Sequence, residues 1–442
     1  MSARRGTRLL AALALAGPVL SFLAAGRAQA ANNPDPRIVA PGTARSSSQR
    51  HLVANAWGYW AFFEGSSGNP AWSYSPTGDD GTWRSDPSGS PVSADIFDGT
   101  GFTGMNDRLT VWYVDQTSHV YVAVGDDTTA VGSRVVHLRK GQLRDNGTID
   151  WLHEGQRSMM EDCADTAHKP YSEAAVGFAL DREGYPWLIL NGGNAGLTTA
   201  NNKTAFLKGI TPFAVGSSSW PAATTSFRIN GQTCGGNPGS DGEGIPGALI
   251  APHIGGAANK VWAIGYDGTN GAINRVYVED NNASSNAEIP TNAPQSITPY
   301  AAGGLEYKSN ISAVVDNSNN LHVAWINNAQ DLLYARFVAT AAADGVQGVH
   351  TFSAGTYEHV SIGLASGTAD LGDRVFMTYI NNLNELYVVS ADTNVHVPGG
   401  WTSEYTNVDA SAEYVSFAYS AKRPFPLPFM YHSGPNEYYD WV

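Results

Sequence analysis

Residues 311–336 read ISAVVDNSNNLHVAWINNAQDLLYAR, and residues 374–389 read RVFMTYINNLNELYVV. Both contain an aromatic residue, then Ile-Asn-Asn, then a leucine-rich run with a tyrosine, and Trp325 lies 54 residues before Tyr379. Val, Ile, Tyr, Trp and Phe dominate the apolar runs, while Asp, Asn and Gly separate them, which is typical of short strands joined by tight turns. The two stretches are therefore predicted to be copies of one unit of antiparallel strands.

Weaker copies of this unit occupy residues 174–190 and 260–279. A repeat of about 50–70 residues with three or four strands is what a β-propeller blade requires, because one four-stranded sheet cannot bury both of its faces alone. The sequence thus predicts an all-β fold, a single β-propeller, with seven blades favoured and six as the alternative. A pair of β-sandwiches or a β-helix is the competing architecture. Units are expected to begin near His51, Arg108, Ala174, Gly247, Ile311, Val360 and Tyr414.

The last unit has only three expected strands, at residues 413–420, 427–432 and 437–442. A strand near Arg37–Ala40, at the start of the mature chain, is expected to complete this blade and close the ring. The propeller domain is therefore predicted to span residues 31–442.

Residues 1–30 combine a basic start, an apolar stretch from Leu9 to Ala25 and an Ala-Gln-Ala ending. These are the three parts of a secretory signal peptide, so we expect a secreted protein. A membrane anchor is the alternative, but Gly17-Pro18 interrupts a run that is already short for a span. No later segment approaches the length of a membrane-spanning helix, so no membrane span is expected.

The formal net charge is −14, and loss of the four arginines in the signal peptide would take it to −18. A surface this acidic repels polyanions, so nucleic acid is excluded as a partner. A densely charged polysaccharide is disfavoured too, unless a local basic pocket overrides the field. We expect a monomer.

The chain has two cysteines, Cys163 and Cys234, and in an exported protein a disulfide between them is expected. Closing a loop of about 70 residues stabilises a fold by roughly 4 kcal/mol in the chain-entropy model. Both cysteines fall between predicted blades, and no zinc motif surrounds them. Ca²⁺ is the one metal left open, because acidic residues flank the cysteines: Glu161, Asp162, Asp165, Asp241 and Glu243.

Residues 57–65 (WGYWAFFEG) and 71–83 (AWSYSPTGDDGTW) resemble the sialidase-like β-propellers that carry Asp-box repeats, and residues 138–151 and 180–187 look similar. The Asp box of that superfamily has a Ser-x-Asp-x-Gly-x-Thr-Trp pattern, approximated here by Ser75, Asp79, Gly81, Thr82 and Trp83. The resemblance implies a propeller and a structural turn in which the Asp caps backbone donors and the Trp packs between strands.

Sialidases of this superfamily bind a carboxylate with three arginines, the first within a Phe/Tyr-Arg-Ile-Pro motif. Residues 36–39 read Pro-Arg-Ile-Val, which lacks both the aromatic residue and the proline. The resemblance therefore leaves catalysis undecided.

Four segments that lead into a predicted blade place a tyrosine within two residues of a glutamate: residues 169–173, 306–310, 357–359 and 413–416. Blade symmetry would gather these side chains around one axial funnel. Tyrosine rings stack on the apolar faces of sugars, and carboxylates accept hydroxyl hydrogen bonds or act as acid and nucleophile. The alternative is that these residues only cap the sheets and face water.

The candidate catalytic residues are Glu306, Tyr307, Glu358, Glu413, Tyr414 and His168, the last as the base of a lyase. The candidate substrate-binding residues are Tyr171, Tyr307, Tyr357, Tyr414, Arg157 and Lys308, the last two as cations that face the funnel. The sequence thus predicts a secreted, carbohydrate-directed propeller whose partner is an extracellular glycan. Two alternatives stay open: a glycoside hydrolase or polysaccharide lyase of the sialidase-like type, and a non-catalytic surface or interaction protein.

Overall fold

The computed structural model describes the strands and most tight turns of the chain. The described residues are 37–43, 50–65, 70–79, 81–84, 96, 109–125, 135–158, 176–192, 203–209, 223–227, 249–252, 260–267, 272–279, 295–296, 311–327, 329–338, 346–353, 357–367, 372–395, 398–406, 412–422, 426–433 and 436–442. Apart from one short 3₁₀ helix, η4 (Pro398–Gly400), every regular element in these ranges is a β-strand. The prediction of a nearly all-β chain is confirmed.

Four sheets each contain four strands that pair antiparallel in chain order. They are β5 (Leu109–Val114), β6 (His119–Gly125), β7 (Val135–Leu143) and β8 (Ile149–Ser158); β9 (Val176–Leu180), β10 (Pro186–Gly192), β11 (Lys203–Gly209) and β12 (Ala223–Phe227); β13 (Leu249–Pro252), β14 (Lys260–Asp267), β15 (Ala272–Glu279) and β16 (Gln295–Ser296); and β17 (Ile311–Val315), β18 (Leu321–Ile326), β19 (Leu332–Phe337) and β20 (Val346–Ser353).

A fifth sheet contains β21 (Tyr357–Ser366), β22 (Arg374–Asn381), β23 (Leu386–Asp392) and β24 (Thr402–Thr406), with β26 (Ser420–Lys422) added parallel to β21. The remaining strands form a seven-stranded sheet: β2 (Leu52–Asn55), β3 (Gly58–Gly65), β4 (Pro70–Ser75), β1 (Arg37–Thr43), β28 (Asn436–Trp441), β27 (Pro428–Ser433) and β25 (Ala412–Phe417).

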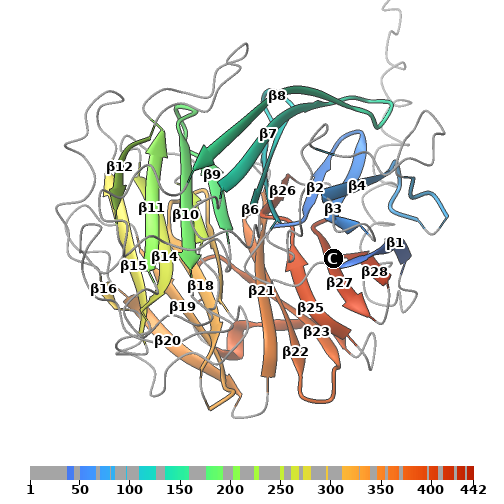
Figure 1. Ribbon diagram of the computed structural model, residues 1–442. Coiled ribbons are helices and arrows are strands. Elements are labelled where there is room, and N and C mark those ends of the chain that lie inside the picture. Colours follow the sequence, from blue (N-terminus) through green and yellow to red (C-terminus); the bar gives the residue numbers. More distant parts are fainter. Residues whose placement is uncertain are drawn as a thin grey trace, which may run out of the picture.

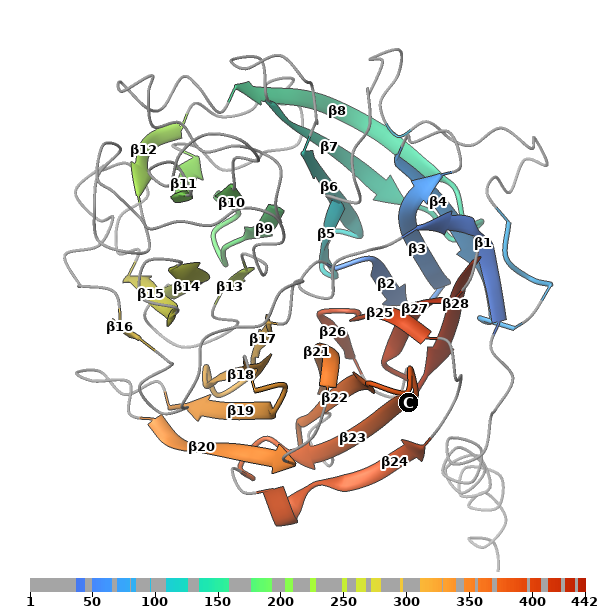
Figure 2. The same ribbon diagram turned by 60° about the horizontal axis from the view of Figure 1, so that its bottom comes forward.

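The sheets surround a common centre rather than stacking in two layers (Figures 1 and 2). Figure 2 shows that first strands such as β5, β9, β13, β17 and β21 lie nearest this centre. Seven strands are each the first strand of a repeat. Each of them starts at most three residues from the position expected from the sequence. They are β2, β5, β9, β13, β17, β21 and β25.

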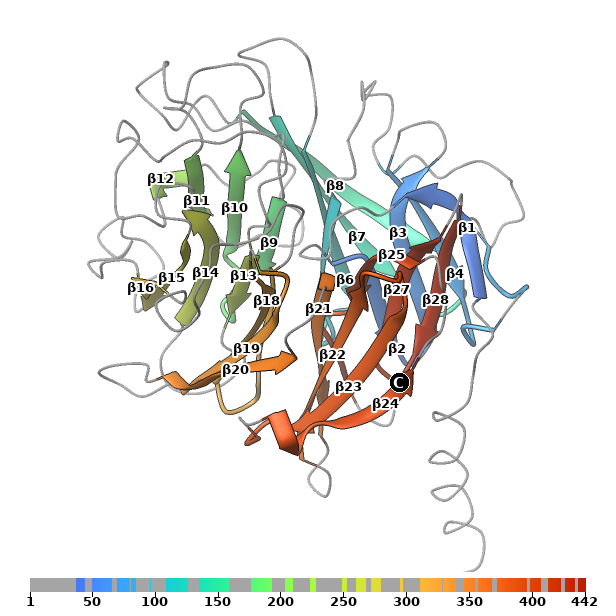
Figure 3. The same cartoon turned by 90° about the horizontal axis from the view of Figure 1, so that it is seen from below.

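Strand β1 lies between β3, from the first repeat, and β28, from the last, as Figure 3 shows from below. It pairs antiparallel with β28, where Arg37 lies opposite Tyr439, and its end pairs with β3, where Thr43 lies opposite Glu64. The expectation that an N-terminal strand near Arg37–Ala40 adds to the last sheet agrees with this pairing.

Neighbouring sheets bury apolar side chains between their faces. In β18 (LHVAWI) every residue is buried, because both faces of the sheet are covered. Val323 and Trp325 belong to a cluster with Trp262 of β14, while Ala324 and Ile326 pack with residues of β21 and β22. Side chains on the two faces of this one strand thus pack against two different neighbouring sheets.

One five-residue turn recurs between strands. Its first residue, Asp or Asn, accepts hydrogen bonds of 2.8–3.0 Å at Oδ1 from the backbone N–H groups two and four positions later. Its fourth residue adopts a positive φ between 59° and 86°, where Gly and Asn are least strained. The Asn-Asn pairs of the repeat therefore encode turns. Among the described residues, four copies begin at Asp181, Asp316, Asn327 and Asn381.

The stretch that resembles an Asp box is a turn after β4. Ser75 Oγ accepts a hydrogen bond from the N–H of Gly78 at 2.7 Å and lies 2.5 Å from Thr82 Oγ1. The Trp83 ring packs edge-on against Tyr439 of β28, with centroids 4.8 Å apart. As the resemblance implies, the tryptophan packs against a strand.

Arg50 lies among the inner strands of several sheets and is 5 % exposed. Its Nη1 donates hydrogen bonds to the carbonyl oxygens of Ile362 (2.7 Å) and Phe417 (3.4 Å), and its Nη2 donates to that of Ala313 (2.6 Å). Its backbone N–H donates to Thr110 Oγ1 at 3.2 Å. One residue therefore links the inner strands β5, β17, β21 and β25.

No helix in the described part of the chain has the length and apolar character needed to cross a membrane.

Candidate functional site

A cavity of about 720 Å³ opens beside Arg50, between sheets β5–β8 and β9–β12, and is called the central pocket here. Its walls come from the C-terminal ends of inner strands and from the turns that follow them. They include residues 52–54, 111–117, 180–184, Pro252 and residues 419–420, with His119, Tyr121 and Lys140 from the second and third strands. A volume of this size suits a small ligand.

Strand register explains why polar side chains reach the central pocket from an otherwise apolar wall. Tyr121 of β6 lies opposite Trp112 of β5 on one side and opposite Lys140 of β7 on the other. His119 lies two residues before Tyr121 and therefore on the same face. This face turns toward sheet β9–β12, because Tyr121 packs with Phe178 and Leu180 of β9.

Lys140 is 1 % exposed, and its Nζ lies 5.5 Å from the centroid of the Tyr121 ring. Burial lowers the pKa of Lys140 and raises that of the Tyr121 hydroxyl well above its usual range. Burial also lowers the pKa of His119, helped by the charges of Lys140 and Arg144, so His119 is neutral at pH 7. The central pocket thus presents a desolvated amine, a neutral imidazole and a phenol.

A tilted aromatic pair forms the inner wall of the central pocket. The rings of Trp112 and Tyr419 have centroids 4.7 Å apart, and the Arg50 guanidinium lies 5.4 Å from the Tyr419 centroid. The Tyr419 hydroxyl accepts a hydrogen bond of 3.1 Å from the N–H of Val315. Burial raises the pKa of Tyr419 to about 12 and lowers that of Arg50 to about 10, so both keep their protons at neutral pH.

The rim of the central pocket is polar. The Tyr113 hydroxyl accepts a hydrogen bond of 3.0 Å from Asn55 Nδ2, and burial raises its pKa. Asp115, Arg182 and Glu183 are exposed on the two turns that border the opening. Hydrogen-bonding groups of both charges therefore surround an aromatic interior, which is the combination that a sugar requires.

Four of the residues predicted for the axial funnel are described, and they lie at the N-terminal ends of β21 and β25, away from the central pocket. Tyr357 is half-buried and Glu358 exposed on β21; Tyr414 is half-buried and Glu413 exposed on β25. The structure brings the two strands together there, since the rings of His359 and Tyr414 have centroids 4.6 Å apart. Tyr414 has a φ of 49°, at a register irregularity of β25.

Other predicted site residues cannot be placed. Arg157 lies in β8 opposite Val136, and its side chain is not described. The remaining predictions fall outside the described residues: His168, Tyr171, Glu306, Tyr307, Lys308, Cys163, Cys234 and the acidic residues around the cysteines. The part of the chain that the structure describes contains no group of three or more His, Cys, Asp or Glu side chains suited to a metal.

Sequence reasoning missed every polar residue of the central pocket. The one available signal was Lys140, a cation two positions after the apolar Leu138, in the stretch of residues 138–151 that resembles the sialidase-like propellers. The tyrosines Tyr379 and Tyr387 near Tyr357 were also missed, although both lie in the stretch that defined the repeat.

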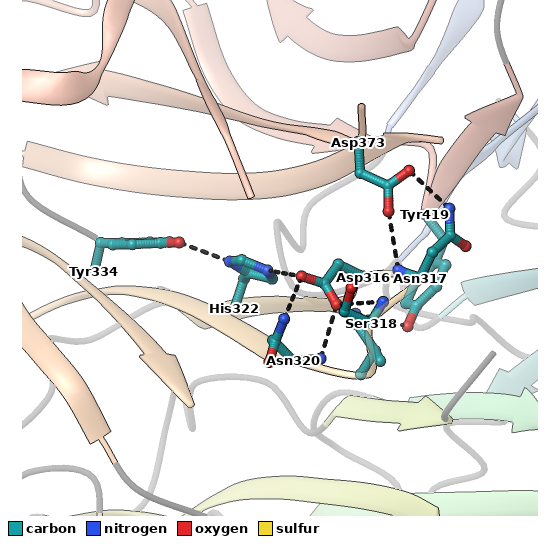
Figure 4. A network of polar contacts seen from close by, with 9 residues as sticks. Asp316, Asn317, Ser318, Asn320, His322, Tyr334, Asp373 and Tyr419 are labelled. Atoms are coloured by element: carbon teal, nitrogen blue, oxygen red, sulfur yellow. Dashed lines mark hydrogen bonds and ion pairs between the residues drawn. The ribbon is translucent and has the colours of Figure 1, made fainter. Parts of the chain in front are cut away.

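Figure 4 shows a buried polar network that resembles a catalytic triad. His322 Nε2 lies 3.1 Å from Asp316 Oδ2, and its Nδ1 lies 2.6 Å from the Tyr334 hydroxyl. Burial lowers the pKa of His322 despite Asp316, so the neutral ring donates to the carboxylate and accepts from the phenol. All three residues are at most 1 % exposed and none of them lines the central pocket, so the network holds the β17–β18 turn against β19.

No family model matches the sequence, and no curated protein matches it either. Solved structures do match. The BP39L lectin from Burkholderia pseudomallei has a TM-score of 0.56 at 13 % identity, over 90 % of this chain and 96 % of the lectin. An ulvan lyase, described as a new family of polysaccharide lyase, has a TM-score of 0.53 at 11 % identity, over 92 % of this chain and 95 % of the lyase. At such low identity the likeness establishes a shared fold, one that lectins and polysaccharide lyases both use.

Proposed function

We propose that this chain is an exported, carbohydrate-directed β-propeller of seven blades that binds an extracellular glycan in the central pocket. Seven first strands support the blade number, and the last blade would be β25, β27 and β28 completed by β1. The proposal of export rests on the signal-peptide pattern of residues 1–30. The proposed Cys163–Cys234 disulfide depends on export, because disulfides persist in oxidising compartments.

The observation that carries the sugar proposal is the composition of the central pocket. Trp112, Tyr113 and Tyr121 supply aromatic surface, while Lys140 and His119 supply hydrogen-bonding groups within the same cavity. A sugar ring presents apolar C–H faces and polar edges, so it needs both kinds of wall. Preorganisation favours binding, and the contacts of Tyr419 with Trp112 and with Arg50 fix one wall.

The proposal is supported by the fold of the matched proteins, a lectin and a lyase that is bound to -[GlcA(1-4)Rha3S]-. Lys140 supplies the local positive charge that an acidic chain would need to accept a carboxylated sugar, so both neutral and uronate-containing glycans are candidates.

A glycan array probed with the mature protein tests the proposal. Lys140→Met keeps the length and apolar contacts of the side chain but removes its charge, so we expect at least a tenfold weaker signal on every glycan that binds the central pocket. Arg144→Met is the matched control, because Arg144 is an exposed cation in the turn that follows β7, bound to Asp150 at 2.5 Å. An unchanged signal in Lys140→Met would contradict the proposed site.

Polysaccharide lyase activity is the second candidate, favoured by one observation. A neutral imidazole (His119), a phenol (Tyr121) and an amine (Lys140) lie on one face of sheet β5–β8. A β-elimination needs a base for the proton next to a uronate carboxylate and a cation that stabilises the charge that develops. The test is the ultraviolet absorbance of unsaturated uronates in digests of uronate polysaccharides. His119→Gln is expected to abolish this absorbance signal. If the wild-type protein gives no signal, this candidate is eliminated.

A further inference from the structure

A second group of tyrosines lies at the opposite end of β21 from the central pocket. Tyr379 of β22 and Tyr387 of β23 are cross-strand partners whose rings stack with centroids 5.3 Å apart and planes at 15°. The Tyr357 ring of β21 meets Tyr379 edge-on, at 5.3 Å and 86°. All three rings are only partly buried, so this tyrosine platform has both aromatic surface and hydroxyl groups at the edge of the fold.

A carboxylate is held in a fixed position beside the tyrosine platform. Glu385 Oε2 accepts hydrogen bonds from the Tyr387 hydroxyl at 2.7 Å and from Asn381 Nδ2 at 2.8 Å. These hydrogen bonds lower the pKa of Glu385, so the group is ionised at neutral pH. Both donors bind Oε2, and a carboxylate has further lone pairs with which it can accept from a ligand hydroxyl.

We propose that the tyrosine platform is a second carbohydrate site, which takes a neutral pyranose that stacks on Tyr387 and donates a hydroxyl hydrogen bond to Glu385. The sugar class rests on the function proposed above. The preference for a neutral sugar comes from charge: the Glu385 carboxylate is bound to the Tyr387 hydroxyl, and a uronate would be repelled by it.

The platform is separate from the central pocket. The N–H of Leu364 donates to the carbonyl oxygen of Tyr419, a residue of the central pocket, at 3.1 Å. Tyr357 lies seven residues before Leu364 on the same strand, which is roughly 23 Å at 3.3 Å per residue. The two sites therefore bind independently, and one molecule can hold two glycan segments at once.

Isothermal titration of the mature protein with methyl glycosides tests this proposal. The probes are the methyl glycosides of glucose, galactose, mannose, fucose, rhamnose and xylose, with methyl glucuronide as the charged comparison. Glu385→Gln changes the carboxylate, and Tyr387→Phe removes the hydroxyl that orients it. Each variant is expected to weaken the affinity of the platform for neutral sugars at least fivefold. Tyr387→Ala removes the ring and is expected to abolish this binding. In the Lys140→Met background the platform is expected to keep one equivalent of sugar.

Tyr438→Ala is the matched control, because Tyr431 and Tyr438 form an equally stacked cross-strand pair, at 5.4 Å and 17°, on β27 and β28. Equal loss in Tyr438→Ala and Tyr387→Ala, or an unchanged affinity in all three platform variants, would overturn the platform. Sugar binding that Lys140→Met removes and the platform variants leave intact overturns the platform alone. Binding that only the platform variants remove overturns the central pocket alone.

Discussion

Arg50 Nη2 donates a hydrogen bond of 2.6 Å to the carbonyl oxygen of Ala313, a residue 263 positions later in the chain. The same guanidinium reaches β21 and β25, so the inner strands of three sheets share one donor group. Carbonyl oxygens at the centre of a ring of sheets have no strand partner on that side, and a planar guanidinium satisfies several of them together. Arg50 therefore connects strands of three sheets that lie far apart in the sequence.

Replacing Arg50 with Met is expected to lower the free energy of unfolding by roughly 3 kcal/mol or more, because buried carbonyl groups lose their donor. Urea denaturation followed by tryptophan fluorescence measures this value. Arg84→Met is the control: Arg84 is exposed over Tyr74, and its loss is expected to cost less than about 0.5 kcal/mol. Equal effects of the two variants would contradict a central role for Arg50.

A chain that begins at residue 45 lacks β1, which pairs with both β28 and β3. Two strand edges would lose their partner, and unpaired edges recruit other chains. We expect a melting temperature several degrees lower and self-association, measured by thermal unfolding and size-exclusion chromatography. A monomer with the melting temperature of the full mature chain would show that β1 does not close the fold.

Stability is expected to fall as the pH drops below 6.5. The pKa of His322 is lowered from 6.5 in the folded state, so below that pH the unfolded chain binds a proton that the folded chain does not, and unfolding becomes more favourable. The lowered pKa of Asp316 acts in the same direction below about pH 3.8. Denaturation midpoints between pH 8 and 5 measure the effect.

His322→Gln is expected to cost roughly 2 kcal/mol at pH 8, because it breaks the hydrogen bonds to Asp316 and Tyr334, and to flatten the pH dependence. His119 also has a lowered pKa, so His119→Gln is the comparison that separates the two histidines. A pH dependence identical to wild type in His322→Gln would contradict the assignment.

The fold was largely predictable because its repeating turns depend on interactions between residues that are close in the sequence. Asn327 and Asn381 begin the same turn in two copies of the unit, and their side chains fix that turn through hydrogen bonds within five residues. The pairing of β1 with β28 was also foreseeable, since a unit with three strands needs a fourth. The number of blades and the closing of the ring remain predictions.

The candidate site was harder to predict because it depends on contacts between distant strands. Trp112 and Tyr419 are in contact although 307 positions separate them, and no local pattern indicates such a pair. Lys140 and Tyr121 face each other through strand register, which sequence periodicity does not reveal across two strands. The predicted tyrosine–glutamate funnel includes Tyr357, and all of its members stay predictions.

A crystal structure of the mature protein with its strongest array glycan tests the central claim most directly. We expect a sugar ring in the central pocket, in contact with Trp112 and with a polar atom within hydrogen-bond distance of Lys140 Nζ. A glycan bound only elsewhere on the protein, with the central pocket filled by water, would contradict it.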